Sequence, residues 1–237
     1  MSRIIMISDI HGCIDQFDQL INSLELTTTS DKLVLLGDYV DRGPNSKEVV
    51  DKVMFLVKEY GAVALRGNHD QRLVDLIRNK DDIIESKFIQ HGGIDTINSY
   101  CDHNNMNSKL DLNSAISIIR ENYSHHIDFL SNLPLFYEDD HHIYVHAGIN
   151  PKYVNWKEQT DHDFMYIKDE FYLHPTAIDK KVVFGHTKVF DIHGSADVWF
   201  GEDKIGIDGG CAYGLQLNGL ILEKGQYNTI AISNHSK

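Results

Sequence analysis

The chain has 237 residues, of which 42% are hydrophobic and 24% are charged, values that indicate a folded protein with a substantial core. Its net charge of -13 excludes a general nucleic-acid-binding surface, because such a surface needs clustered lysines and arginines to displace counterions. The three cysteines are scattered and form no CxxC pair, which argues against a disulfide framework or a zinc knuckle.

The first apolar run, Ile4–Ser8, meets Asp9 too early to be a signal-peptide core or a membrane span. No repeat, low-complexity tract or Gly/Ser linker divides the chain. We therefore expect a cytoplasmic protein in which residues 1–237 form a single domain. We expect neither nucleic acid nor membrane among its partners.

Three strand–loop–helix units follow one another in the first third of the chain. The runs Ile4–Ser8, Lys32–Leu36 and Ala62–Leu65 have the length and apolar character of buried strands. Each is followed by a polar loop and then by apolar residues at helical spacing. This succession predicts a parallel sheet whose loops converge on one edge, the edge where open α/β folds bind their ligands.

The rest of the chain has a different texture. Residues Ile83–Leu130 show helical segments interrupted by the Asp/Asn-rich stretch Asp102–Asn107, and we interpret this region as a helical cap. Further on, Lys204–Asp208, Leu215–Glu223 and Tyr227–Ile232 have the pattern of strands joined by glycine-containing turns. They predict a second, mostly antiparallel sheet.

Five predicted strand ends carry side chains suited to metal or phosphate binding. In chain order they are Asp9 and His11, then Asp38, Asp41 and Arg42, then Asn68 and His69, then His146, and finally His186. Carboxylate, imidazole and amide ligands without thiolate suit manganese, iron(II) or zinc. Two such ions about 3.5 to 4 Å apart share a bridging carboxylate and clamp the oxygens of a displacement at phosphorus.

These ordered motifs resemble those of the calcineurin-like metallophosphoesterases, and within them the bacterial and phage branch of the phosphoprotein phosphatase family. The motifs are Asp-x-His-Gly from Asp9, Gly-Asp-x-x-Asp-Arg-Gly from Gly37, Gly-Asn-His-Asp from Gly67, His-Ala-Gly from His146 and Gly-His from Gly185. The resemblance implies a four-layer α/β/β/α sandwich with a helical cap insertion. It also implies two divalent metal ions, with manganese as the first choice and iron or zinc as alternatives.

The resemblance further implies a role for each residue of the motifs. The metal ligands would be Asp9, His11 and Asp38 for the first ion, and Asp38, Asn68, His146 and His186 for the second. A hydroxide bridging the two ions would attack phosphorus directly. His69 would protonate the departing alkoxide, Asp41 would accept the other ring proton of His69, and the Arg42 fork would bind two phosphate oxygens.

Two more residues are predicted to contact the substrate. Arg66 precedes the third motif and would either touch the substrate or lie behind the metal ligands. Lys168 aligns with an arginine that binds phosphate in the family, and it would supply a point charge instead of a bidentate fork. Alternatively, Lys168 is an ordinary solvated lysine on a helix. Tyr213 resembles a family tyrosine near the site, but a core or surface aromatic fits equally well. Histidines outside the motifs, such as His91 and His126, are interpreted as surface or helix-face residues.

Three functions follow from this reading. The favoured one is a metal-dependent Ser/Thr protein phosphatase, with dual specificity as an extension, acting on phosphorylated proteins or small phosphoesters. The alternative is a symmetrical bis(5'-nucleosyl)-tetraphosphatase, which Asp70 and the His-Ala-Gly motif favour, whereas Asp41 with Arg42 favours the phosphatase. The third is an inactive homologue that binds phosphorylated partners. Only the replacement of the family arginine by Lys168 favours it.

Overall fold

The first sheet of the computed structural model, which describes residues 3–101 and 111–234, has the strand order β10-β9-β1-β2-β3. β1 (Arg3–Ile7), β2 (Asp31–Leu35) and β3 (Val63–Ala64) are parallel neighbours, which confirms the prediction from the three strand–loop–helix units. β9 (Gln216–Glu223) and β10 (Gln226–Ser233) form a hairpin that pairs antiparallel to β1.

The second sheet is mixed and has the order β4-β5-β6-β8-β7. Its strands are β4 (Phe136–Glu138), β5 (His142–Val145), β6 (Lys181–Phe184), β8 (Lys204–Gly206) and β7 (Trp199–Phe200). β5, β6 and β8 are parallel, and only the edge strands run antiparallel. The prediction of a mostly antiparallel second sheet is therefore wrong, because the hairpin expected there pairs with β1, a strand from the other end of the chain.

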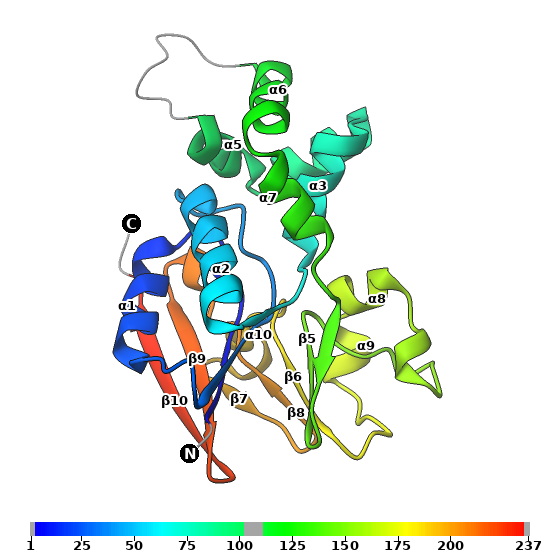
Figure 1. Cartoon of the computed structure of the whole chain (residues 1–237). Coiled ribbons are helices and arrows are strands. Elements are labelled where there is room, and N and C mark those ends of the chain that lie inside the picture. Colours follow the sequence, from blue (N-terminus) through cyan, green and yellow to red (C-terminus); the bar gives the residue numbers. More distant parts are fainter. Residues whose placement is uncertain (1–2, 102–110, 235–237) are drawn as a thin grey trace.

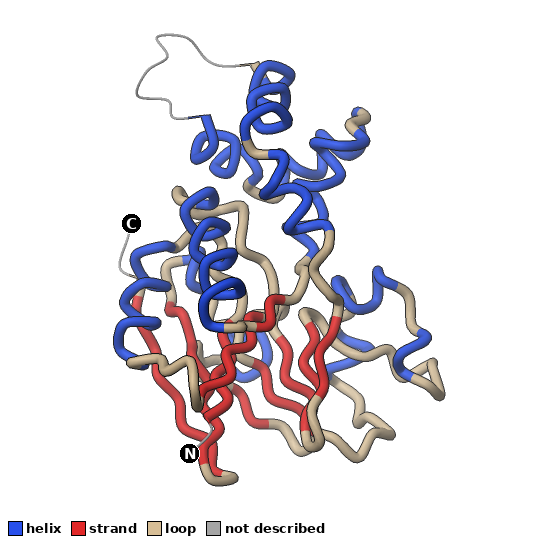
Figure 2. The backbone as a smooth tube through the Cα atoms, viewed as in Figure 1, coloured by secondary structure: helices blue, strands red, loops and turns tan. Residues whose placement is uncertain are grey.

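The two sheets lie face to face between two layers of helices, as Figures 1 and 2 show. α1 (Ile14–Leu24) and α2 (Ser46–Tyr60) cover the first sheet, and α8 (Asp161–Tyr166) and α9 (Asp169–Tyr172) cover the second. The interior between the sheets is apolar; its fully buried members include Met6, Val34, Leu65, Tyr144, Val183, Ile205 and Leu220. The predicted α/β/β/α sandwich is confirmed.

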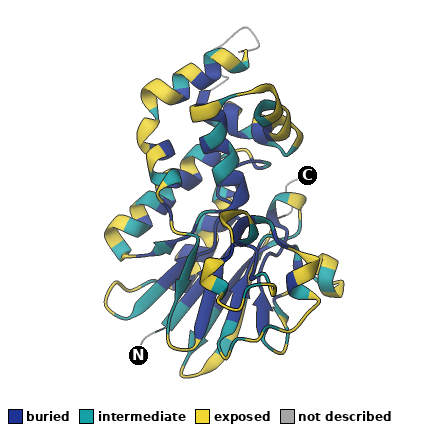
Figure 3. Cartoon of the chain, turned by 90° about the vertical axis from the view of Figure 1, so that its right-hand side faces the viewer, coloured by how far each residue is buried: buried dark blue, intermediate teal, exposed yellow. Residues whose placement is uncertain are grey.

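The helical cap projects from the carboxyl edge of the first sheet (Figure 1). It consists of α3 (Asn68–Asn79), α4 (Asp82–Gln90), α5 (Gly93–Cys101), α6 (Leu112–Asn122) and α7 (Ser124–Ser131). Asp81 and Asp111 begin two of these helices by accepting hydrogen bonds from first-turn amides. Figure 3 shows the exposed outer sides of the cap helices and the buried strands below them. The Asp102–Asn107 stretch lies outside the described residues, and among those described no helix has the length and apolarity to cross a bilayer.

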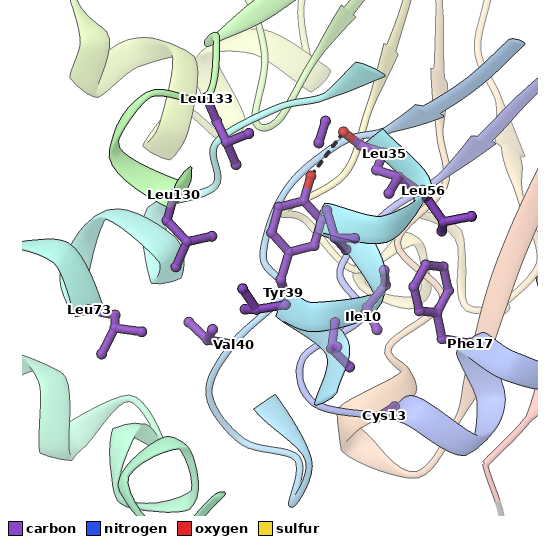
Figure 4. Close-up of a cluster of buried hydrophobic side chains, with 14 of the residues drawn as sticks. Ile10, Cys13, Phe17, Leu35, Tyr39, Val40, Leu56, Leu73, Leu130 and Leu133 are labelled. Carbon is purple, nitrogen blue, oxygen red and sulfur yellow. Dashed lines mark hydrogen bonds between the residues drawn. The ribbon is translucent and has the colours of Figure 1, made fainter. Parts of the chain in front are cut away.

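Tyr39 fixes the loop after β2 in the core beneath the cap, where it packs among the residues drawn in Figure 4. Its ring is fully buried, and its hydroxyl donates to the carbonyls of Leu35, at 3.2 Å, and Leu65, at 2.8 Å. Neighbouring Val40 is also fully buried. Because Asp38 precedes and Asp41 follows this pair, burial of the pair anchors the acidic loop.

Candidate active site

The polar loops of both sheets meet at one edge of the sandwich. The amide of Asp9 donates to the Gly37 carbonyl at 3.1 Å, and the amide of His186 donates to the Asp9 carboxylate at 2.9 Å. The amide of His69 donates to the Asp38 carboxylate, also at 2.9 Å. The structure thus brings together side chains from strands far apart in the sequence.

Two groups of side chains in this region have the spacing of metal ligands. One contains His11, Asp38 and His69, the other Asp38, His146 and His186, and within each group the ligand atoms lie within 4.8 Å of one another. Nε2 of His11 is 3.4 Å and Nε2 of His146 is 3.5 Å from the Asp38 carboxylate. Asp38 belongs to both groups, as a bridging carboxylate must.

The histidines present lone pairs toward Asp38. Nδ1 of His11 lies 2.7 Å from the Val40 carbonyl and Nδ1 of His146 lies 2.8 Å from the Leu36 carbonyl. A carbonyl can only accept, so Nδ1 carries the proton in both rings and Nε2 is left to bind a ligand. Burial lowers the pKa of His11 and of His186 well below the usual value, which favours the neutral form that metals require.

Three observations fit this donor set to divalent cations. Among the described residues, Nε2 of His186 is buried and has no hydrogen-bond partner. Nε2 of His146 faces the Asn68 amide oxygen at 3.0 Å as well as Asp38, so acceptors converge on one point. Burial lowers the pKa of His146, but Asp38 and Asp9 raise it to about 9, which indicates a position that favours positive charge.

The loops that carry these residues also show backbone strain. Six residues of the site have a positive φ, namely Asp9, His11, Asp38, Asp41, Arg42 and His186. Such conformations cost energy in non-glycine residues and cluster where side chains are held for function. Asp9 belongs to neither distance group, and its carboxylate accepts from Ser8 and His186.

Asp70 connects the second and third polar loops. One of its carboxylate oxygens accepts from the amides of Asp38 and Gly67, and the other accepts from the amide of Tyr39, all at 2.9 Å. The side chain is fully buried. From the sequence alone, Asp70 served only to distinguish two enzyme branches, whereas in the structure it holds two loops together.

His69 is oriented by a hydrogen-bonded chain that reaches into the cap. Its Nδ1 donates to Asp41 Oδ2 at 2.7 Å, and Asp41 Oδ1 accepts from the Thr96 hydroxyl, also at 2.7 Å. The same hydroxyl accepts from the Asp41 amide at 2.8 Å. Thr96 lies on α5, far from every motif, so no sequence signal pointed to it.

Two arginines face the other ring nitrogen of His69. Nη2 of Arg42 is 2.8 Å and Nη1 of Arg72 is 3.1 Å from His69 Nε2, which must accept from both because guanidinium groups only donate. Arg72 was missed by the sequence analysis. It follows His69 by three residues on α3, and this helical spacing is the signal that would have found it.

A cavity of about 210 Å³ opens over these groups. Its wall consists of Asp38, Asn68, His69, His186, the cations Arg42, Arg72, Lys168 and Lys188, and His91, Tyr166, Tyr213, Asp191 and Asp208. Lys168 and Tyr213 therefore both border it. His91 does as well, so its interpretation as a mere surface residue was incomplete. Four cations around one small cavity make it suited to a phosphate group, although the protein as a whole is acidic.

Arg66 and His126 lie elsewhere. Nη1 of Arg66 donates to the Ser131 carbonyl at the end of α7 at 2.9 Å, and Arg66 does not line the cavity. Its role in substrate binding stays a prediction. His126 is buried in the cap, not on a surface, and its Nδ1 lies 3.0 Å from the Tyr100 hydroxyl.

Comparisons with known proteins were made for the sequence and for the fold. The family model described as calcineurin-like phosphoesterase matches residues 2–208. The asymmetrical bis(5'-nucleosyl)-tetraphosphatase PrpE of Anoxybacillus flavithermus is 27% identical over 91% of this chain and 88% of its own. A symmetrical bis(5'-nucleosyl)-tetraphosphatase of Nitrosococcus oceani is 44% identical, but over only 29% of this chain and 24% of its own.

Solved structures share the fold at lower identity. One provisionally described as a diadenosine tetraphosphatase has a TM-score of 0.63 and 24% identity, covering 97% of this chain and 93% of its own. A serine/threonine phosphatase of Saccharomyces cerevisiae has a TM-score of 0.59 and 15% identity, covering 98% of this chain and 80% of its own. The relatives thus support a bis(5'-nucleosyl)-tetraphosphatase, the alternative predicted from the sequence, better than the favoured protein phosphatase. The likeness to the serine/threonine phosphatase extends to the fold alone.

Proposed function

Because the chain belongs to the calcineurin-like phosphoesterase family, we propose that it is a metal-dependent hydrolase of dinucleoside tetraphosphates. The observation that carries this proposal is the cavity over Asp38, where two arginines and two lysines face the space beside the candidate metal ligands. A chain of four phosphates needs more positive charge than a single phosphate group does. The tetraphosphatase named among the relatives along nearly the whole chain adds support.

The metal ligands are assigned as the motifs suggest. Asp9, His11 and Asp38 would hold one ion, and Asp38, Asn68, His146 and His186 the other. When bound, these ions would polarise the phosphate and lower the pKa of water to make a nucleophile. Manganese is the first choice, with iron or zinc as alternatives, because all three suit oxygen and imidazole ligands.

The protein's own groups then orient the phosphate. Arg42 and Arg72 donate to His69 Nε2 in this structure, and phosphate oxygens would accept these hydrogen bonds instead. This exchange would free the lone pair of His69 Nε2, which would take up the proton released by the attacking water and pass it to the leaving oxygen. Asp41 would hold the opposite ring nitrogen throughout, with Thr96 holding Asp41.

Product analysis tests the proposal. The protein is incubated with diadenosine tetraphosphate and manganese, and the nucleotides are separated by chromatography. ATP with AMP would indicate asymmetrical cleavage, and two ADP molecules would indicate the symmetrical cleavage considered in the sequence analysis. An intact substrate, with p-nitrophenyl phosphate hydrolysed by the same sample, would refute the proposal.

A phosphoprotein phosphatase is the second candidate, and the pairing of His69 with Asp41 at 2.7 Å favours it. The alkoxide of serine or threonine is a poor leaving group that needs a general acid, whereas a departing phosphate chain needs one far less. Comparison of kcat/KM for a Ser/Thr phosphopeptide and for diadenosine tetraphosphate separates the two candidates. A higher value for the peptide would assign the site to phosphoproteins.

A further inference from the structure

A second cavity, called here the side cavity, adjoins the site cavity along α8 and the start of α9. Its volume is about 460 Å³, against about 210 Å³ for the site cavity, and Tyr166 and Lys168 line both. Small-molecule sites usually occupy about 300 to 1,000 Å³. The site cavity alone is thus too small for a dinucleotide, and the side cavity is the adjoining space of sufficient size.

A pair of stacked rings forms part of the side cavity. The rings of His162 and Tyr166, one helical turn apart on α8, have centroids 4.5 Å apart and planes inclined by 15°. On the site-cavity side, the guanidinium of Arg72 lies 5.4 Å from the Tyr166 centroid. Tyr166 therefore belongs to the walls of both cavities, while exposed His162 extends the flat surface outward. Such surfaces stack with nucleobases regardless of base identity.

The polar groups of the side cavity differ from those of the site cavity. Asp163, Asp169 and Glu170 line it together with Lys152 and Lys168. Within residues 3–101 and 111–234, no hydrogen bond or ion pair involves the Glu170 carboxylate or the Lys168 ammonium. Carboxylates accept hydrogen bonds from the hydroxyls of a ribose but repel phosphate. Lys168 stands at the boundary, where the phosphate chain would pass from one cavity to the other.

We propose that the side cavity binds a nucleoside of the dinucleoside polyphosphate, with its base stacked on His162 and its ribose hydroxyls facing Glu170 and Asp169. This inference rests on the proposed function, since it assumes a nucleotide substrate. It divides the substrate between the two cavities: phosphates lie among the arginines and a nucleoside lies on the rings. A peptide with basic residues beside its phosphate is the competing occupant, because it too would meet the three carboxylates.

The test compares a substrate that needs the side cavity with one that does not. KM and kcat are measured for diadenosine tetraphosphate and for p-nitrophenyl phosphate in wild type, His162→Ala, His162→Phe and Glu170→Gln. His141→Ala, which removes an exposed histidine near the start of β5, is the matched control. His162→Ala should raise KM for the dinucleotide about tenfold, the value of one lost base stack, and Glu170→Gln should raise it about threefold. His162→Phe should stay near wild type, and no variant should alter p-nitrophenyl phosphate kinetics.

Other outcomes overturn the inference. An equal change for both substrates would mean that His162 acts through the site cavity, and no change would mean that the nucleoside lies elsewhere. A rise in KM confined to a basic phosphopeptide would assign the side cavity to peptides.

Failure of the proposed function is recognised separately. Wild type would then hydrolyse p-nitrophenyl phosphate but not diadenosine tetraphosphate. In that case AMP is titrated as an inhibitor of p-nitrophenyl phosphate hydrolysis. Inhibition about tenfold weaker in His162→Ala would sustain nucleoside binding in the side cavity, and equal inhibition in both proteins would overturn it.

Discussion

The two ring nitrogens of His69 face groups of opposite charge. The Asp41 carboxylate accepts from Nδ1, and two guanidinium groups donate to Nε2. We expect His69→Ala to lower kcat for a Ser/Thr phosphopeptide by about 10² to 10⁴ while both metals stay bound, the usual effect of losing a general acid. The loss for diadenosine tetraphosphate should be much smaller, because its leaving phosphate needs little protonation. Steady-state kinetics with elemental analysis measures both quantities. Activity within a few-fold of wild type on the peptide would show that the acid is misassigned.

Arg72 provides a second prediction at the scale of single residues. Arg72→Ala should lower kcat/KM by about 10- to 100-fold, since a hydrogen bond from a charged donor to phosphate is worth about 1.5 to 3 kcal/mol. Arg72→Lys should recover only part of this loss because lysine lacks the fork. Arg78→Ala, on the same helix but paired with exposed Asp128, is the control. If Arg72→Ala and Arg78→Ala have equal kinetics, Arg72 does not bind phosphate.

At the scale of elements, the cap is tied through α5 to the acidic loop after β2. Thr96 both donates to and accepts from Asp41, and the Gly92 carbonyl before α5 accepts from the Arg42 amide at 3.0 Å. Thr96→Val, which keeps the shape of the side chain, should lower kcat for a Ser/Thr phosphopeptide about tenfold by loosening Asp41, with KM and metal content unchanged. Thr96→Ser should restore most of the activity. A purely structural role would instead give both variants equal kcat and a lower melting temperature.

The junction between α3 and the loop after β2 depends on Asp70. Asp70→Ala would leave three buried amides without acceptors, each costing about 1 to 3 kcal/mol. We expect the free energy of unfolding, measured by urea denaturation, to fall by about 3 kcal/mol or more. Asp75→Ala, on the same helix and in contact only with Gln71 among the described hydrogen bonds, should cost far less. Equal free energies of unfolding for the two variants would show that the hydrogen bonds of Asp70 do not stabilise these loops.

At the scale of the whole molecule, the proposed metal ligands come from both sheets, so binding of cations should stabilise the entire sandwich. Each site occupied by manganese at 100 times its Kd should add about 2.7 kcal/mol to the free energy of unfolding, and a chelator should remove this gain. In Asp38→Asn the effect should disappear at both sites, because this carboxylate is common to the two ligand groups. Thermal denaturation with and without chelator measures it, with exposed Asp51→Asn as control. Unchanged metal content in Asp38→Asn would contradict a shared ligand.

Features that depend on neighbouring residues could be predicted from the sequence, whereas features that depend on contacts between distant segments could not. Asp38 and Asn68 follow the ends of apolar strands by only three and four residues, so their place at the sheet edge could be inferred from a few neighbouring residues. The hairpin β9–β10 was assigned to the wrong sheet because its partner, β1, comes from the opposite end of the chain. Thr96 was missed for the same reason, since its hydrogen bond to Asp41 is made only when the cap folds back.

The pairing of β9 with β1 also bears on how the protein is made. On the ribosome β1 emerges early, with Asp9 and His11 just behind it, but the strand that lies along its free side is translated much later. Until then one edge of β1 has unpaired backbone N–H and C=O groups, which can form hydrogen bonds with strands of other nascent chains. Folding intermediates of this protein should therefore be prone to aggregate, and they should acquire catalytic competence only after synthesis has passed the hairpin.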